Sequence, residues 1–322
     1  MPERHKTPIC SNTHNLLEKN DTYALRGVCM IMIIVHHTYL SAIDLPQCHT
    51  DSWLRFLDIG WSWGYDGTGV FLFLSGFGMF FSLLRNRPIC KTYIRNKVVK
   101  LFIPFLWLWA ISLAVYILFD AKQLTPQLFT SFLSLDIPPD NEAWFYKVII
   151  GLYTVSILIF NTFRSPRTCV AVVTAVCVAY YCVANFILNT NLWWFITVLN
   201  FPFGMLVAIS YDKLKNIRPI YLILPCAILF ALLQYFHPNP TISSLLFTVI
   251  AISIIRYMNI DNHLLRYIGT NSILFYFLEE PAINYLSQFA GFSFYTYSLT
   301  AIAMTLLLVF LCQKAEKALQ GT

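Results

Sequence analysis

The sequence predicts an all-α integral membrane protein with about ten transmembrane helices and cytoplasmic N- and C-termini. Of the 322 residues, 57% are hydrophobic and only 12% are charged, whereas a soluble domain carries about 25% charged residues. So few charged side chains cannot cover the surface of a soluble globule of this size. The long, continuous apolar runs favour helices over the short alternating strands of a membrane β-barrel. Composition thus excludes a soluble cytoplasmic enzyme, a nucleic-acid-binding domain and a disordered chain.

Ten stretches are apolar and long enough to cross a bilayer. They are 24–43, 59–84, 98–119, 143–163, 168–188, 192–210, 219–236, 241–258, 267–290 and 294–313. The first stretch is too long for a signal-peptide core and has no small-residue cleavage site, so we expect a retained span.

The distribution of cations predicts the orientation of these spans. If the N-terminus is cytoplasmic, 19 of the 22 lysines and arginines fall on cytoplasmic segments, and only Arg55, Lys122 and Lys147 fall outside. Cytoplasmic loops of membrane proteins carry this excess of cations. We therefore expect a cytoplasmic segment (1–23), a single transmembrane domain (24–313) and a cytoplasmic tail (314–322). The expected location of this multi-pass protein is the cytoplasmic membrane.

The spacing of cysteines and histidines predicts neither disulfides nor a metal site. The nine cysteines are an odd number, and most of them fall inside apolar runs. They are typical of small buried hydrophobic residues. No metal-ligand spacing links them to histidines, so we expect no bound metal.

Two ionisable side chains in the first span are candidate functional residues, because charge is costly in lipid. Arg26 and His37 are eleven residues apart, which places them on one helix face, about 16 Å apart along the axis. A histidine at this depth suits proton transfer near neutral pH. His36 points about 80° away from Arg26. The alternative for both histidines is a hydrogen bond to a neighbouring helix, or contact with water.

Two carboxylates lie deep in the ninth span, just before Pro281. If this span begins near residue 267, Glu279 lies about 18 Å from the inner surface. A carboxylate at that depth must be neutral, paired or beside water. Glu279, and Glu280 after it, are therefore candidates for a functional or a structural role.

Three further residues are candidates for binding an acceptor. Glycines and Ser75 along the second span permit close helix packing or leave room for a ligand. Asp66 lies near the outer end of that span, and Trp194 is one of six tryptophans near the outer boundary. Aromatic rings there can stack on sugars, or they form the usual aromatic belt.

The segment from Arg85 to Lys100 is the most basic cytoplasmic segment of its length, with six cations and no acid. The positive-inside rule explains the sign of this charge but not the number of cations. Such a cluster suits a polyphosphate ligand or anionic lipid headgroups. The candidate ligand-binding residues are Arg85, Arg87, Arg95, Lys97 and Lys100.

Four segments, in this order, resemble the acyltransferase 3 family of integral membrane acyltransferases. They are Leu25-Arg26-Gly27 with His37, then the run from Phe71 to Phe77, the basic run that ends at Pro104, and Ile268-Gly269-Thr270-Asn271-Ser272 with the following aromatic residues. Glu279 stands where many relatives have a histidine, and Lys97 and Lys100 stand where arginine is common.

The resemblance implies transfer of an acyl group, usually acetyl, from a cytoplasmic acyl-CoA to a hydroxyl of an extracytoplasmic glycan or lipid-linked sugar. Acyl-CoA is then a co-substrate, and no cofactor is permanently bound. In this interpretation His37 is the base, Arg26 orients the donor or stabilises developing charge, and the basic segment holds the donor phosphates. Direct transfer and an acyl-histidine intermediate both remain open.

The main alternative is a transporter or flippase of a glycan or lipid, with no acyl-transfer chemistry. It predicts internal repeats and discontinuous helices in both halves. No convincing repeat is present in the sequence, although Pro202 and Pro281 interrupt two spans. The expected partners are the bilayer, the donor and the glycan, with no nucleic acid.

Overall fold

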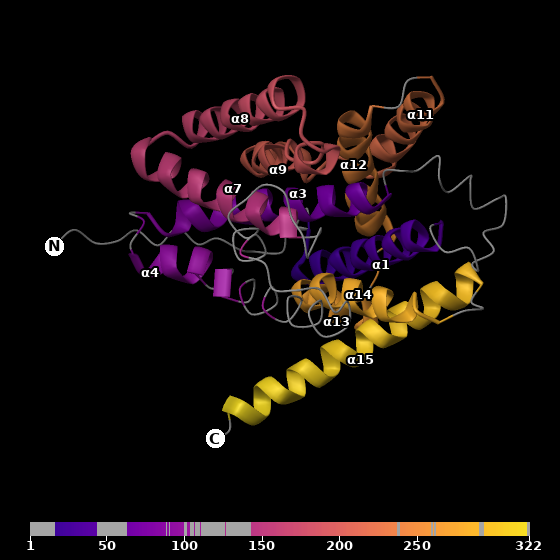
Figure 1. The fold of residues 1–322 in the computed structure, drawn as a ribbon. Coiled ribbons are helices and arrows are strands. Elements are labelled where there is room, and N and C mark those ends of the chain that lie inside the picture. The colour runs from indigo at the N-terminus through magenta and orange to yellow at the C-terminus, as the bar shows by residue number, and fades with distance from the viewer. Residues whose placement is uncertain are drawn as a thin grey trace.

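The part of the chain that the computed structural model describes is mostly helical and shows no β-strand (Figure 1). The described residues are 17–43, 63–87, 89, 91–99, 102–103, 106, 110, 126, 143–236, 239–258, 260, 262–289 and 293–320. The helices are α1 (Lys19–Ile43), α3 (Trp63–Arg85), α4 (Lys91–Ile94), α7 (Ala143–Thr162), α8 (Pro166–Cys182), α9 (Asn200–Ile209), α10 (Tyr211–Leu214), α11 (Ile220–Phe236), α12 (Pro240–Met258), α13 (His263–Thr270), α14 (Ser272–Leu286) and α15 (Phe294–Gln320). The described residues also form two short π-helical segments, Arg95–Val99 and Val183–Ile187, and one 3-10 turn, Leu192–Trp194.

Six of these helices are apolar and long enough to cross a membrane. They are Lys19–Ile43, Gly64–Arg85, Trp144–Thr162, Pro166–Ile187, Pro240–Met258 and Phe294–Lys314. The shorter apolar helices α9 and α11 and the broken pair α13–α14 occupy three more of the predicted spans. The all-α membrane architecture is therefore confirmed, while the total of ten spans and the orientation of the termini stay predictions.

Some predicted features fall outside the described residues. The third predicted span, 98–119, lies almost wholly outside the described residues. Most of the N-terminal segment 1–23 also lies outside them, as does Lys100. The six cysteines that are described (Cys29, Cys169, Cys177, Cys182, Cys226 and Cys312) are all free thiols.

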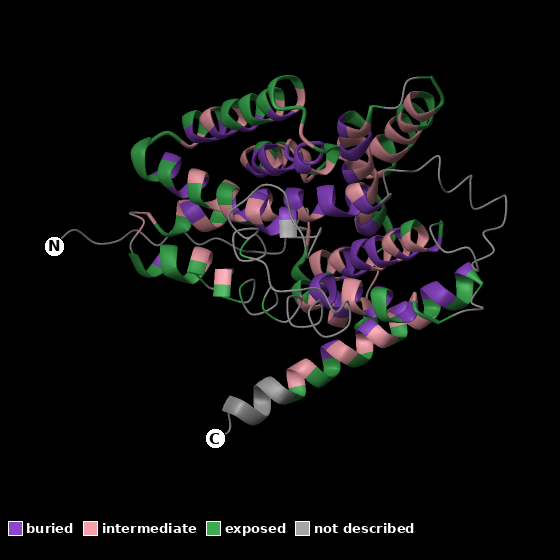
Figure 2. Ribbon diagram, viewed as in Figure 1, coloured by how far each residue is buried: buried purple, intermediate pink, exposed green. Residues whose placement is uncertain are grey.

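The helices stack in an order that differs from the chain order. From one edge of the molecule to the other, α8 lies on α9, α9 on α3, α3 on α1, α1 on α13 and α14, and α14 on α15 (Figure 1). Buried residues concentrate on α1, α3, α9 and α14, whereas α8 and α11 expose much of their apolar surface (Figure 2). Helices α1 and α3 therefore form the centre of the bundle, and the functional candidates on them are enclosed.

Close packing explains Gly76 in the second half of α3. A Cβ on Gly76 would overlap the backbone carbonyl of Phe201 in α9, and a Cβ on Gly204 would overlap the carbonyl of Phe73 in α3. These reciprocal contacts bring the two backbones together, as small residues do between membrane helices. Packing, rather than room for a ligand, thus accounts for Gly76.

A buried polar network joins α3, α9 and α12. The Asn200 side-chain amide donates to Ser244 Oγ (3.0 Å), and its carbonyl oxygen accepts from Thr248 Oγ1 (2.9 Å). All three side chains are inaccessible to solvent, and Gly69 of α3 packs directly against Asn200 and Ser244. Satisfied polar groups of this kind fix the register between neighbouring helices.

Candidate functional site

The ninth predicted span is broken into two helices, and the break positions α14. Asn262 caps α13, because its side chain accepts from the amides of Leu264 and Leu265 (2.9 and 3.1 Å). Helix α13 then packs against α1 so closely that a Cβ on Gly269 would overlap the Tyr23 carbonyl. The break falls at Asn271, and α14 continues beside α1. The residues of α14 are thereby brought alongside those of α1.

His37 and Glu279 form a hydrogen-bonded pair between α1 and α14. The distance from His37 Nδ1 to Glu279 Oε1 is 3.1 Å. Glu279 is inaccessible to solvent, while the His37 side chain is 19% exposed. The two residues are 242 positions apart in the sequence. A carboxylate that accepts from Nδ1 fixes the imidazole orientation and places the basic lone pair on Nε2.

Arg26 lies on the same face of α1 as His37, about 16 Å nearer the N-terminal end of the helix. Its Nε atom is buried and has no hydrogen-bond partner among the described residues. The guanidinium group is close enough to Tyr153 and Tyr23 to interact electrostatically with both. Arg26 and the His37–Glu279 pair are thus two separate positions along one helix face.

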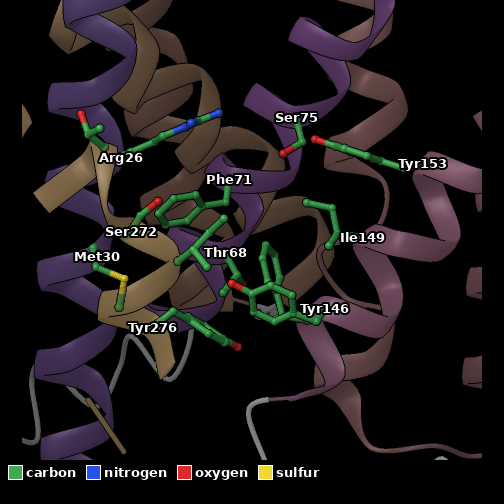
Figure 3. A pocket seen from close by; sticks show the side chains of 13 residues that line it. Arg26, Met30, Thr68, Phe71, Ser75, Tyr146, Ile149, Tyr153, Ser272 and Tyr276 are labelled. Atoms are coloured by element: carbon green, nitrogen blue, oxygen red, sulfur yellow. The ribbon is translucent and has the colours of Figure 1, made fainter. Parts of the chain in front are cut away.

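Arg26 lines a partly open cavity of about 160 Å³ between α1, α3, α7 and α14 (Figure 3). The residues named in Figure 3 are Arg26, Met30, Thr68, Phe71, Ser75, Tyr146, Ile149, Tyr153, Ser272 and Tyr276. The Ser75 and Tyr153 hydroxyls point toward one another and form a hydrogen bond, and the Arg26 guanidinium group extends toward them. The cavity therefore has a polar end at Arg26 and an aromatic end at Tyr146 and Tyr276.

Sequence reasoning predicted Arg26 and Ser75 in this region but missed Tyr153. Nothing in the apolar segment 143–163 distinguishes this tyrosine from the aromatic residues around it. Only the packing of α7 against α3 brings its hydroxyl to Ser75.

Two predicted acceptor residues, Asp66 and Trp194, are not among the described residues that line this cavity. Asp66 is buried on α3 beside Cys29. Trp194 is buried on the far side of α7, where it lines a second, apolar cavity of about 270 Å³ with Lys147 and Tyr180. The Tyr180 hydroxyl donates to the Trp194 carbonyl (3.0 Å). The structure therefore brings Ser75, but not Asp66 or Trp194, to the cavity that Arg26 lines.

The predicted phosphate-binding cations have different surroundings. Arg85 and Arg95 are exposed. Arg87 donates to the Arg164 carbonyl (2.7 Å) and lies over the Phe160 ring at 5.0 Å, so it holds the turn between α7 and α8. Lys97 is half-buried, and this burial lowers the pKa of its ammonium group.

His36 faces away from Glu279 and contacts α3. Its ring is buried against Gly64 and packs edge-on to Tyr65, with ring centroids 5.7 Å apart. Across the described part of the chain, no cluster of histidine, cysteine and acidic residues is suited to a metal ion.

Comparison with known proteins gives one match. A family model described as an acyltransferase domain, Acyl_transf_3, matches residues 23–313, which include α1 and both halves of the broken span. No curated protein and no solved structure gives a significant match.

Proposed function

Because the chain belongs to the acyltransferase 3 family, we propose that it moves an acyl group, acetyl in the first instance, from a cytoplasmic acyl-CoA to a glycan hydroxyl. The family and the six membrane-length helices make it a multi-pass membrane acyltransferase. The glycan is extracytoplasmic or lipid-linked, and the membrane is the cytoplasmic membrane.

The His37–Glu279 pair is the observation that carries this proposal. A general base needs an unprotonated nitrogen near the acceptor hydroxyl and a partner that orients its ring. Glu279 provides that partner, because its Oε1 accepts from His37 Nδ1. His37 is partly accessible while Glu279 is fully enclosed, which suits a base that contacts substrate and a carboxylate that does not.

The proposed reaction is direct transfer. His37 Nε2 removes the proton of the acceptor hydroxyl as the oxygen forms a bond to the thioester carbonyl carbon. The carbon–sulfur bond then breaks, and the coenzyme A thiolate takes up the proton from His37. Glu279 stabilises the imidazolium that exists between these two proton transfers.

The two substrates reach this pair from opposite sides in our proposal. The basic segment that contains Arg85 and Arg95 lies at the predicted cytoplasmic end of α3, where it suits the phosphates of the donor. His37 lies in the half of α1 that is predicted to face outward, nearer to a glycan. Arg26 would contact the donor between these two places.

The test compares acylation by wild type, His37→Ala and His36→Gln. Membranes from cells that express each variant are incubated with acetyl-CoA, and the release of thiol is measured. The masses of the surface glycans are determined by mass spectrometry. We expect His37→Ala to lower the rate by at least about 100-fold, because general-base catalysis contributes about that much. His36→Gln alters the neighbouring ring, which faces away from Glu279, and should retain activity.

Two outcomes separate the alternatives. Acylation by His37→Ala at the wild-type rate would exclude this residue as the base.

The break at Asn271 is a feature that transporters also have, so a transporter is the second candidate. A transporter would leave thiol release and glycan mass unchanged when the gene is deleted.

A further inference from the structure

We propose that the second cavity, between α7 and α8, binds one acyl chain of an anionic phospholipid whose headgroup lies at Lys147. We call this space the lipid cavity. Among the described residues it shares no lining residue with the cavity that Arg26 lines. The proposal therefore does not depend on the acyl transfer proposed above.

Helix α7 forms one wall of the lipid cavity over about two turns. Lys147, Gly151 and Val155 line it, and a spacing of four residues places them on one face of the helix. These eight residue steps cover about 12 Å of helix length. Val176 and Tyr180 of α8 contribute to the opposite wall, and the two helices pack against each other (Figure 1). The cavity is thus an elongated groove between two neighbouring helices.

Gly151 leaves space in the α7 wall that the described part of the protein does not fill. A Cβ on Gly151 would meet no described atom within 4 Å, and the residue is exposed. A glycine in a membrane helix commonly lets a second helix approach, as Gly76 does here. Because no helix approaches Gly151, the space beside it is open to an occupant from outside the chain.

The remainder of the wall suits hydrocarbon rather than water. Its aliphatic side chains are Val148, Leu152, Val155, Val176 and Val198. The Tyr180 hydroxyl already donates to the Trp194 carbonyl (3.0 Å). A water molecule in a cavity needs two to four polar partners, and an empty cavity leaves the atoms of its wall without van der Waals contacts. An acyl chain from the bilayer supplies those contacts.

Volume and length agree on a single straight chain. The lipid cavity measures about 270 Å³. An apolar cavity of about 150 Å³ holds one benzene molecule, so this volume holds about eleven carbon atoms. Three bonds of an extended chain span about 3.3–3.6 Å, so the 12 Å along α7 corresponds to about ten bonds. An isoprenoid chain carries a methyl branch in each repeat and needs more volume over the same length, which favours an unbranched acyl chain.

Lys147 identifies the charge of the headgroup. It is half-buried and lies about 6 Å from the first residue of α7, at the end of the helix that is predicted to face outward. Lysine side chains near the ends of membrane helices extend toward the headgroup region. No acidic residue is among the described residues that line the lipid cavity. A lipid with a net negative headgroup can therefore place its chain in the cavity and its phosphate beside the ammonium group.

The lipid cavity lies behind the part of α7 that carries Tyr146 and Tyr153. These two tyrosines point into the other cavity, which Arg26 lines (Figure 3), whereas Lys147, Gly151 and Val155 face the lipid cavity. A bound acyl chain would thus pack against the back of a helix whose other face belongs to the candidate site.

The experiment measures quenching of Trp194 fluorescence by phosphatidylglycerol that carries bromine on one acyl chain. Trp194 is buried and lines the lipid cavity, so bromine reaches its ring through that cavity. The purified full-length protein is placed in phosphatidylcholine nanodiscs with increasing fractions of the brominated lipid. The difference between wild type and Trp194→Phe gives the Trp194 signal. We expect about fivefold preference for phosphatidylglycerol over phosphatidylcholine, the usual contribution of one lysine near a membrane surface.

Two variants fill the lipid cavity from opposite walls, and each has a matched control. Gly151→Leu and Val176→Phe should lose most of the quenching of Trp194. Gly78→Leu and Val178→Phe add the same side chains at exposed positions that do not line the lipid cavity, and they should be quenched like wild type. Circular dichroism and the melting temperature establish that each variant is folded. Wild-type quenching in both folded cavity-filling variants would overturn the proposal.

A change at Lys147 tests the headgroup. Lys147→Gln should still be quenched when all the lipid is brominated, but it should bind the two lipids equally. A wild-type preference for phosphatidylglycerol in Lys147→Gln would overturn the assignment of the headgroup to this residue.

Competition with unlabelled lipids tests which chain is bound. Unlabelled phosphatidylglycerol should relieve the quenching by its brominated form. If an equal fraction of a polyprenyl phosphate relieves it more strongly, the occupant is an isoprenoid lipid and the phospholipid assignment is overturned.

Discussion

Glu279 is a carboxylate in a fully enclosed position, and its contact with His37 gives it a specific role. An ionised carboxylate in such a place is stable only with a partner that carries or shares positive charge. The imidazole on α1 can become that partner during the reaction, when it accepts a proton from the acceptor. In the proposed reaction, Glu279 therefore positions His37 and favours its charged form.

Glu279→Gln should lower kcat by about 10³- to 10⁴-fold, because the amide cannot fix the imidazole tautomer or stabilise the imidazolium. Glu279→Asp keeps the charge on a shorter side chain and should retain part of the activity. The measurement is kcat for acyl transfer at equal amounts of folded protein. Glu280→Gln, at the next residue, should transfer acyl groups normally. A wild-type kcat for Glu279→Gln would show that the contact has no part in the chemistry.

The sequence predicted the candidate functional residues, but it did not predict which residues they contact. Arg26, His37 and Glu279 were detectable because ionisable groups in apolar spans are rare. Nothing in the sequence could place Glu279 at His37 rather than beside water, since the two are 242 residues apart. Tyr153 had no signal at all, because a tyrosine in an apolar helix is ordinary until its neighbours are known.

The contact between α3 and α9 is a close backbone contact that a substitution can test. Gly76→Ala places a methyl group against the backbone carbonyl of Phe201, so the two helices must separate. We expect a loss of about 1–3 kcal/mol in the free energy of unfolding, the usual cost of overpacking. Thermal or denaturant unfolding in detergent measures this change.

Gly78→Ala is the matched control on the same helix. A Cβ on Gly78 meets nothing within 4 Å, and alanine in a helix is favoured over glycine by about 1 kcal/mol. Gly78→Ala should therefore be neutral or slightly stabilising. Equal stability of the two variants would mean that α3 and α9 do not pack as closely as described.

At the scale of elements, hydropathy predicted the six described helices of membrane length but could not find the break at Asn271. Residues 267–290 are mostly apolar although they include Thr270, Asn271 and Ser272, and their hydropathy predicts one helix. The break depends on the Asn271 side chain, which bonds to the Tyr267 carbonyl and to Gln313. Gln313 belongs to α15, and such tertiary contacts leave no local signal in the sequence.

Two contacts between connecting segments, both among the described residues, are compatible with the predicted alternation of sides. Arg87 bonds to the Arg164 carbonyl, and Arg256 bonds to the Lys215 carbonyl (3.1 Å), so each pair of predicted cytoplasmic segments meets at one end of the bundle. At the other end, Thr38 contacts Ser298, between the predicted outer ends of α1 and α15. These contacts fix which ends lie together, and the cation bias predicts which end is cytoplasmic.

Labelling of single cysteines with a membrane-impermeant maleimide in intact cells tests this orientation. Gln288→Cys lies at the exposed end that follows α14 and should react, because that end is predicted to face outward. Arg218→Cys is equally exposed but should react only after the membrane is permeabilised. The background has Cys10, Cys48, Cys90 and Cys182 replaced by serine, which leaves only buried or half-buried native thiols. The opposite labelling pattern would place the basic segment and Arg26 on the outer side of the membrane. Because no acyl-CoA is available there, the proposed direction of transfer would then be wrong.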